Sequence, residues 1–365
     1  MTNKYKVAIN AITLNEVHFA DRFMATLNEA DMVIVADTGS TDGTVEKLRS
    51  LGAIVHEIKV LPWRFDVPRN VALHLVPEDV DIVVPIDLDE ILLPGWRKAL
   101  EDAWTPETTR LRYPYTWSFK EDGSPDVTFY YDKIHARKGY RWVHPVHEVI
   151  TPQIGTIEKF AVSDGVILHH YPDKTKSRGS YLPLLELSTK EDPMDDRNSH
   201  YLAREYTFYS KWEEAIIEAK RHLELPTAKW NCERASSMRL ISQSYRNLGY
   251  IAEAKNWLFK AIAEDNTSRE SFVDLSDLCQ ATKDWLGSYN AAIQALSITN
   301  RNMSYMSKGY CWGAKPHDLA SVSAWYLGLK KESIQHAKNA LAIEPNDKRL
   351  QENLKLIEEL IKNGA

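Results

Sequence analysis

Two carboxylates, Asp87 and Asp89, directly follow a short apolar run at residues 82–86. A brief apolar run bounded by polar residues is typical of a buried parallel strand, and ligands of open α/β sheets bind at the carboxyl ends of such strands. Two carboxylates at that edge offer hard anionic oxygens, which suit Mn²⁺ or Mg²⁺ holding a diphosphate. The same spacing also occurs in strand-end turns with solvated acids, so the motif alone leaves both interpretations open.

The elements that must position these carboxylates form an alternating series. Strand-like stretches occur at residues 5–12, 32–36 and 53–58, and helical spacing occurs at residues 18–30 and 44–51. A strand–helix–strand alternation at this spacing predicts parallel strands joined by crossover helices. We therefore expect an α/β domain with a mostly parallel sheet in the first half of the chain.

Polar residues follow the second predicted strand at positions 37–44, which contain two glycines and lead into a helix. Such a turn can bind an anion at the helix start, but this one lacks the lysine of a phosphate loop, and Asp37 would repel a phosphate. We expect Asp37 to accept hydrogen bonds from a nucleobase or a ribose. A tight turn with a helix cap at Asp42 or Thr41 is the alternative.

Arg69 and Asn70 fall at the start of a later predicted helix. The planar guanidinium group of arginine matches the acceptors of a diphosphate or a base edge. A surface arginine paired with Asp66 is the alternative interpretation.

Four motifs now stand in order, at residues 10–16, 37–44, 64–73 and 86–90. They read Asn-x-Ile-Thr-Leu-Asn-Glu, Asp-Thr-Gly-Ser-Thr-Asp-Gly-Thr, Arg-Phe-Asp-x-x-Arg-Asn-x-Ala-Leu and Ile-Asp-Leu-Asp-Glu. As a set they resemble the inverting, nucleotide-sugar-dependent glycosyltransferases of family 2, which have the GT-A fold, a Rossmann-like α/β domain. The resemblance covers roughly residues 5–185.

The resemblance implies a donor site for a UDP-sugar and a bound Mn²⁺ or Mg²⁺. It makes Asp89 a metal ligand, together with Asp87. Lys176 and Arg178, on an expected lid, carry positive charge that would neutralise the leaving diphosphate. The other residues expected to bind the nucleotide sugar are Thr13, Asn15, Glu16, Asp37, Ser40, Asp42, Arg69, Asn70 and Asp87.

Aromatic, histidine and carboxylate residues converge at positions 140–148. An inverting transfer needs one general base to take the acceptor's proton, and Glu148 is our candidate, with Trp142 and His147 shaping the acceptor pocket. Asp164 and Glu90 are the alternative bases.

His169 follows a further predicted strand. Its position resembles the third metal ligand of metal-dependent relatives, and imidazole suits Mn²⁺ better than Mg²⁺. A structural histidine bonded to the backbone is the alternative.

The second half of the chain predicts an all-α domain of helical repeats. Small residues recur at Ala215, Ala254, Ser288 and Ser333 within four similar segments, which resemble degenerate tetratricopeptide units. We therefore expect two domains, residues 1–185 and 186–365. Repeat arrays form concave surfaces for peptides or for self-association, so a homodimer through this domain is one expectation. The insert at residues 300–316 predicts either a contact loop or helix packing.

Bulk properties narrow the class further. The chain has 365 residues and a net charge of −6, which does not indicate a strong sequence-independent grip on nucleic acid. Three scattered cysteines fit a reducing compartment. Neither a signal peptide nor a run long enough to span a bilayer is evident, so we expect a cytoplasmic protein.

The sequence thus predicts a metal-dependent inverting glycosyltransferase whose acceptor is a peptide, a glycan or a modified nucleobase such as hydroxymethylated phage DNA. One alternative is a non-catalytic repeat scaffold with a vestigial transferase domain. Another is a phosphatase with Asp87 as nucleophile. This last reading is weaker because the strand is the fourth and Ile91 stands where such sites usually carry threonine or valine.

Overall fold

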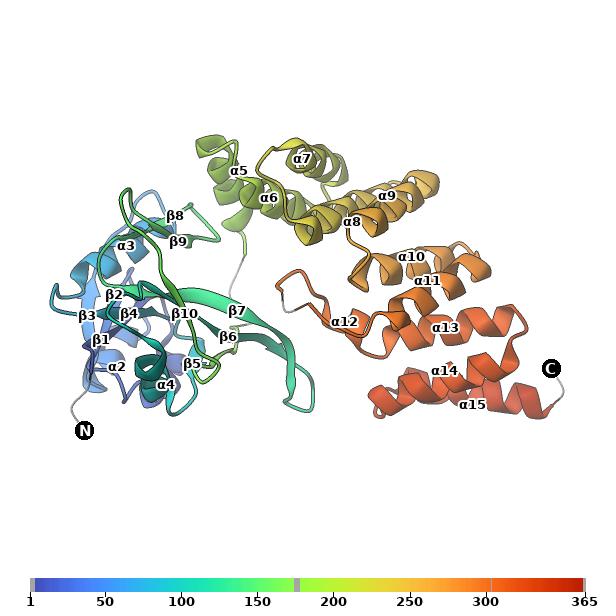
Figure 1. Ribbon diagram of the computed structural model, residues 1–365, viewed down its shortest axis with the longest axis horizontal. Coiled ribbons are helices and arrows are strands. Elements are labelled where there is room, and N and C mark those ends of the chain that lie inside the picture. Colours follow the sequence, from blue (N-terminus) through green and yellow to red (C-terminus); the bar gives the residue numbers. More distant parts are fainter. Residues whose placement is uncertain (1–3, 174–177, 303, 364–365) are drawn as a thin grey trace. The chain divides into compact units, whose positions relative to one another are not determined.

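The computed structural model describes residues 4–173, 178–302 and 304–363 (Figure 1). The chain divides into two compact units, residues 1–188 and 189–365. The first unit is a mixed sheet with helices, and the second is a series of helices.

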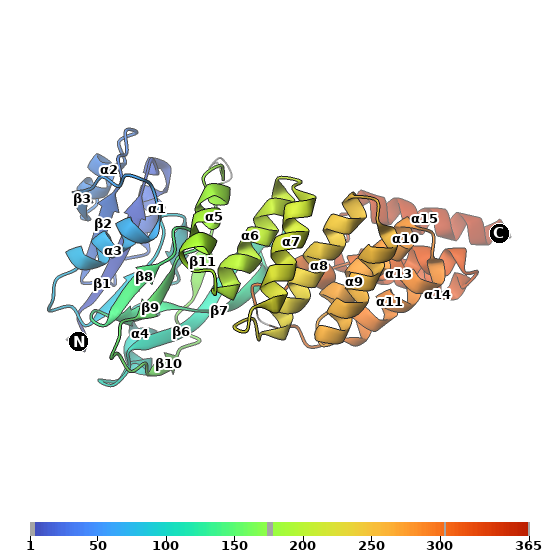
Figure 2. The same cartoon turned by 90° about the horizontal axis from the view of Figure 1, so that it is seen from above.

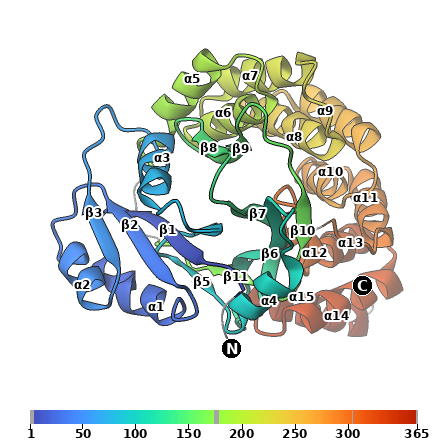
Figure 3. The ribbon, with the colours of Figure 1, turned by 60° about the vertical axis from the view of Figure 1, so that its left-hand side comes forward.

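Four parallel strands form one side of the sheet in the order β3-β2-β1-β4. Their connections carry helices on both faces of the sheet, with α1 and α2 on one face and α3 on the other (Figure 3). The elements are β1 (Val7–Thr13), η1 (Val17–Phe19), α1 (Ala20–Ala25), β2 (Met32–Asp37), α2 (Thr44–Ser50), β3 (Ile54–Glu57), α3 (Asp66–Leu75) and β4 (Ile82–Pro85).

The three inner strands β1, β2 and β4 are buried on both faces, to which alternate side chains point. Ile9 and Val35 pack in one core cluster with Phe23. Ala8 and Ile34 pack on the other face, in a cluster that includes Leu73 of α3. The continuous apolar runs read from the sequence are therefore the central strands of a sheet covered on both sides.

The rest of the sheet is mixed in direction. Strand β7 runs antiparallel to β4 and β6, β11 runs parallel to β6, β5 closes the edge antiparallel to β11, and β10 pairs with β6; β8 and β9 form a separate pair. The sheet is thus mixed, and the GT-A fold itself stays a prediction. The elements are β5 (Glu90–Leu92), α4 (Trp96–Ala103), β6 (Arg110–Phe119), β7 (Pro125–Ala136), β8 (Tyr140–Val143), β9 (Val149–Pro152), β10 (Phe160–Val162), β11 (Leu168–His170) and α5 (Tyr181–Glu191), which ends in the second unit.

The second unit consists of successive helices, whose order Figure 2 shows clearly. Antiparallel neighbours α6·α7, α8·α9, α10·α11 and α13·α14 pack as pairs. The elements are α6 (Asp196–Phe208), α7 (Trp212–Glu224), α8 (Asn231–Asn247), α9 (Ile251–Glu264), α10 (Glu270–Ala281), α11 (Trp285–Ser297), α12 (Gly309–Trp312), α13 (Lys315–Tyr326), α14 (Lys330–Ile343) and α15 (Lys348–Lys362).

A hydrogen bond recurs inside three of these helix pairs. A buried serine hydroxyl on the first helix donates to the backbone carbonyl of a small residue on the second, always twelve residues later. The three bonds run from Ser242 to Ala254, from Ser276 to Ser288 and from Ser321 to Ser333, at 2.8, 2.8 and 2.9 Å. The expected helical repeat is thereby confirmed, because a contact with a fixed sequence separation in successive pairs is the mark of a repeated unit.

The expected absence of a transmembrane helix can be checked on the described part of the chain. None of its helices combines the length and the apolar character that crossing a bilayer requires.

Candidate active site

The carboxyl ends of β1 and β2 lie level with each other because Thr13 pairs in register with Asp37. The Thr13 hydroxyl donates to Glu16 Oε2 at 2.8 Å. The Glu16 amide donates to Thr44 Oγ1 at 2.8 Å. Thr13 and Glu16 are both buried. Their two hydrogen bonds hold the loop after β1 against the start of α2.

Asn15, Ser40 and Asp42 join the loop after β1 to the loop after β2. The Asn15 amide donates to Ser40 Oγ at 2.8 Å, and the Asn15 side chain accepts from the Thr41 amide at 2.8 Å. Asp42 accepts from the amides of Val17 and Thr44 at 3.1 and 3.0 Å. These residues, expected to bind the nucleotide sugar, are thus engaged in holding the two loops together.

Asp37 is buried at this edge and keeps one oxygen for another partner. Its Oδ2 accepts from the amides of Gly39 and Ser40, each at 3.0 Å. Within the described ranges its Oδ1 is buried with no hydrogen-bond partner. A buried carboxylate oxygen is costly to leave unpaired, so Asp37 Oδ1 is positioned to accept a hydrogen bond from a ligand.

Arg69, in the first turns of α3, bridges two acidic groups. Its Nη2 donates to Asp87 Oδ1 and Oδ2 at 2.8 and 3.1 Å, and its Nε donates to Glu148 Oε1. The guanidinium also lies 5.0 Å from the ring centre of Trp142. Asp66, the alternative partner, instead pairs with Arg64.

Asn70 fixes this arrangement by joining α3 to β8. Its side chain donates to the Trp142 carbonyl and accepts from the Trp142 amide, both at 2.9 Å. Trp142 is 2% exposed and packs in the core, so it supports Arg69, where the sequence analysis expected an acceptor pocket. His147 lies edge-on to Tyr181, with ring centres 5.6 Å apart.

The charges around Asp87 keep it ionised. Burial opposes ionisation, but the positive charges of Arg69 and Lys133 lower the pKa of Asp87 to about 2. The Asp87 amide donates to Glu90 Oε2 at 2.9 Å, and the Tyr115 hydroxyl donates to Glu90 Oε1 at 2.7 Å. Burial raises the pKa of Glu90.

The histidine beside Asp89 is His170, not the expected His169. His170 Nε2 lies 3.5 Å from Asp89 Oδ2, and its ring stacks on Trp117 with centres 4.4 Å apart. His169 points to the other face of β11 and packs edge-on against Phe119. Successive residues of a strand face opposite sides, so a shift of one position changes which histidine reaches the carboxylate.

Two functional candidates were missed by sequence reasoning. Neither His170, the neighbour of the predicted ligand His169, nor Lys133 is among the residues that the sequence predicts for the site. Lys133 is buried on β7, and although burial lowers its pKa, the charges of Tyr131, Glu90 and Asp87 outweigh burial and raise the pKa. A lysine inside an otherwise half-buried strand is the signal that could have identified it, because lysine is rarely buried without a charged partner.

The lid expected after β11 is described only in part. Lys176 lies outside the described residues. Arg178 places its guanidinium 4.7 Å from the ring centre of Tyr181, and Tyr181 in turn contacts Phe65 with ring centres 6.1 Å apart.

Comparison with known proteins adds structural neighbours but no family. No protein-family model matches the chain, and no curated protein does. Among solved structures, it is similar to PilF of Pseudomonas aeruginosa, with a TM-score of 0.37, 12% identity, and coverage of 47% of this chain and 70% of that one.

Two further neighbours are named as tetratricopeptide-repeat proteins. One is YrrB, described as having an unusual peptide-binding site, with a TM-score of 0.39, 13% identity, and coverage of 49% of this chain and 84% of that one. The other comes from Parabacteroides merdae, with a TM-score of 0.39, 14% identity, and coverage of 50% and 67%. These scores are too low to support an inference, so the repeat architecture rests on the hydrogen bonds described above.

Proposed function

We propose that the first unit is a metal-dependent inverting glycosyltransferase that uses a UDP-sugar. The observation that carries the proposal is the gathering of Asp37, Asp87 and Asp89 at one edge of the sheet, where β1 pairs in parallel with both β2 and β4. Ligands of α/β sheets bind at such edges. The positive charges of Arg69 and Lys133 stabilise the ionised carboxylate of Asp87 at this edge. A bound diphosphate would contact the same two cations.

Asp37 provides the contact to the nucleoside. Its unpaired Oδ1 accepts a hydrogen bond from the N–H of a uracil ring or from a ribose hydroxyl. Its other oxygen is fixed by two backbone amides, so the free oxygen has one defined direction. A carboxylate held in this way favours a donor-bearing base edge over a phosphate.

Asp89 and His170 are the residues that would hold the cation. Their oxygen and nitrogen lie 3.5 Å apart, and a carboxylate with an imidazole is a donor set that fits Mn²⁺ better than Mg²⁺. Both oxygens of Asp87 already face Arg69, so Asp87 contributes mainly negative charge. Such an ion, when bound, stabilises the charge that develops on the leaving diphosphate.

Glu148 is the general base of the proposal. Its Oε1 accepts from Arg69, which leaves Oε2 to take the proton of the acceptor. The alternative bases are less suited: both oxygens of Glu90 accept from donors, and Asp164 lies in an exposed turn, where it accepts from the Tyr130 hydroxyl at 2.6 Å.

The reaction is then a single displacement. The acceptor attacks the anomeric carbon from the face opposite the diphosphate, the bond to the diphosphate oxygen breaks, and the acceptor's proton moves to Glu148. Inversion follows from this geometry. A peptide, a glycan and a modified nucleobase all offer a nucleophile that this base can serve.

The test is calorimetric titration of the full chain with UDP, with and without Mn²⁺. We expect Mn²⁺-dependent binding of UDP that Asp89→Asn weakens strongly, and weaker binding in Asp37→Asn with or without the ion. Asp122→Asn, in an exposed turn of the same unit, is the matched control and should bind as the wild type does. Failure of the wild type to bind any uridine nucleotide would refute the proposal.

The second candidate function is a protein-interaction scaffold, and the surface of the helical repeats favours it. Large apolar side chains are exposed near the ends of three helices, with Tyr250 before α9, Leu286 at the start of α11 and Tyr326 at the end of α13 at 55, 60 and 60% exposure. Exposed apolar side chains mark an interaction surface where they lie side by side. The ring of Tyr326 stacks on that of Trp285, the neighbour of Leu286 in the chain, with ring centres 4.0 Å apart. Sedimentation of the full chain tests self-association, and a Tyr326→Ser/Leu286→Ser variant should shift any dimer to monomer.

A further inference from the structure

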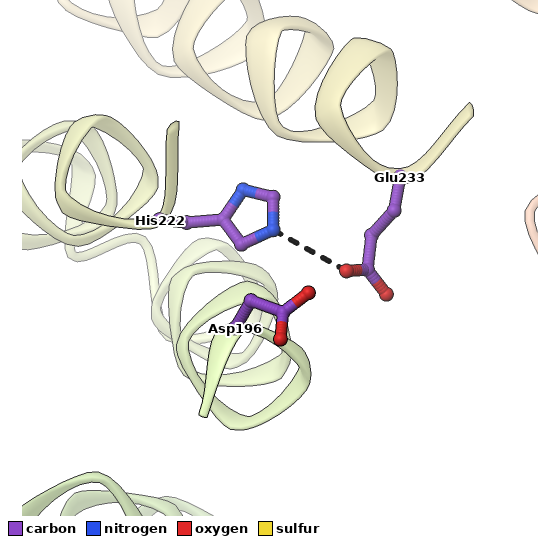
Figure 4. Close-up of side chains that lie close together, drawn as sticks. All are labelled: Asp196, His222 and Glu233. Atoms are coloured by element: carbon purple, nitrogen blue, oxygen red, sulfur yellow. Dashed lines mark hydrogen bonds and ion pairs between the residues drawn. The ribbon is translucent and has the colours of Figure 1, made fainter. Parts of the chain in front are cut away.

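Three side chains with metal-binding atoms meet in the second unit, and none of them belongs to the proposed transferase site. Asp196 lies in the first turn of α6, His222 in the last turn of α7, and Glu233 in the first turn of α8. Their potential ligand atoms all lie within 4.8 Å of one another. Figure 4 shows the three side chains pointing toward a common point from three helices.

Burial separates this cluster from an ordinary group of surface acids. His222 is fully buried and Glu233 is 3% exposed. Buried carboxylates are almost always paired with a cation or a hydrogen-bond donor. Asp196 is half-buried, and among the described residues no hydrogen bond or ion pair to its carboxylate is found, so a buried histidine and two carboxylates share one small volume.

The geometry of the buried pair already suits a metal ion. His222 Nε2 lies 3.3 Å from Glu233 Oε1. Two ligands of a tetrahedral zinc ion, each at about 2.0–2.1 Å from it, are separated by roughly 3.3 Å. Asp196 would have to approach by no more than about 1.5 Å to complete the same triangle, which rotation of a half-buried side chain permits.

The surroundings orient these ligands. The Tyr305 hydroxyl donates to Glu233 Oε2 at 3.1 Å, which turns Oε1 toward His222; such hydrogen bonds to the non-ligating oxygen are a regular feature of metal sites. His222 Nδ1 is buried and has no hydrogen-bond partner within the described ranges. Without an ion, Nε2 carries the ring proton and donates it to Glu233 Oε1; to bind an ion, the ring would have to shift that proton to Nδ1, so that the lone pair of Nε2 points into the cluster.

We infer that Asp196, His222 and Glu233 form a binding site for a divalent transition-metal ion, zinc or manganese, which joins the first three helices of the repeat unit. One imidazole and two carboxylates suit these ions. Three protein ligands leave a coordination position for water on the side of the half-exposed Asp196. The ion would also offset the repulsion between two carboxylates that meet at the starts of α6 and α8.

The experiment is zinc titration of the full chain in an Asp89→Ala background, after removal of metals by a chelator. That background eliminates the principal cation ligand of the first unit. We expect one equivalent of zinc to bind, and His222→Gln or Asp196→Asn to weaken binding more than about 100-fold, because changes in the outer shell alone cost 10–100-fold. His200→Gln is the matched control, since His200 is a buried histidine whose ring centre lies 5.6 Å from that of His222; it should bind zinc as its parent does.

Co²⁺ provides a second readout that is independent of any activity. We expect the intense visible absorption of tetrahedral cobalt in the Asp89→Ala protein and its loss in Asp196→Asn, whose half-exposed position leaves the fold intact by circular dichroism. Excess Mg²⁺ should not displace zinc, because Mg²⁺ prefers oxygen ligands and binds imidazole poorly. Absence of a zinc equivalent, or zinc binding that persists in both ligand variants, would overturn the inference.

Discussion

The ion pairs of Arg69 with Asp87 and Glu148 contribute measurably to the stability of the first unit. Arg69 is 7% exposed, and its variant Arg69→Met would keep an unbranched apolar side chain in place while removing the donors to Asp87 and Glu148. Removing one partner of a fully buried ion pair costs about 3–5 kcal/mol. The Glu148 side chain is 11% exposed and that of Asp87 is 32% exposed, so water recovers part of this cost for Asp87. We therefore expect a loss of about 2–4 kcal/mol.

The assay must report on the first unit alone, because a chain of two units does not unfold as a single two-state system. Hydrogen exchange of peptides from β1 and β4, measured over a urea series, gives the opening free energy of the sheet. Arg49→Met is the matched control, since Arg49 and Glu57 form an exposed ion pair with side chains 49 and 64% exposed, and its loss should be at most about 1 kcal/mol.

A double variant tests the reason for the loss. If the cost comes from the carboxylate left behind, Arg69→Met/Glu148→Gln should be more stable than Arg69→Met, because a neutral amide is cheaper to bury than a charge. The reasoning is refuted if Arg69→Met loses no more than Arg49→Met, or if neutralising Glu148 restores nothing.

The environments of His135, Ser276 and Glu148 can each be tested by a single substitution. Burial and the charges of Arg110 and Arg137 lower the pKa of His135 to about 4. Between about pH 6.5 and pH 4 the unfolded chain therefore binds a proton at this histidine that the folded chain does not. The free energy of unfolding of the first unit should thus fall by up to about 3 kcal/mol as the pH drops through that window. His135→Gln should remove that part of the slope in hydrogen-exchange measurements at several pH values, and an unchanged slope would contradict the prediction. Ser276→Ala removes the hydroxyl donor to the Ser288 carbonyl, so calorimetric unfolding of the repeats should show a loss of about 1 kcal/mol. An exposed change such as Ser297→Ala, which removes a bond within one helix, should cost less. Glu148→Gln should reduce sugar transfer by about 10²–10⁴-fold while UDP binding is retained; a variant that keeps its rate would exclude Glu148 as the base.

The sequence predicted the chain's repeated units and the edge where its acidic residues gather, because both depend on periodicity and on strand ends. Continuous apolar runs gave the buried strands, and the recurrent small residues marked the helix pairs. These features are local, so neighbouring residues suffice to reveal them.

The sequence could not show which residues far apart in the chain contact each other in the folded protein. Whether His169 or His170 reaches Asp89 depends on the pleat of a three-residue strand, which is too short to show a pattern. Likewise, Ser40 and Asp42 could be assigned to a ligand or to a loop, and only the position of the loop after β1 shows that they contact it. Lys133 and Arg69 come together with Asp87 through strands and a helix far apart in the chain.

The serine-to-carbonyl bonds of the repeats also bear on how the second unit loses its structure. Each bond lies within one helix pair, so it survives when a neighbouring pair opens. Melting can therefore advance stepwise along the array, with the last pair fraying while earlier ones persist, as expected for a one-dimensional chain of coupled units. If the protein is shortened from its carboxyl terminus by one helix pair at a time, the midpoint of thermal unfolding of the repeats should fall gradually. Folding should not be abolished by the first truncation.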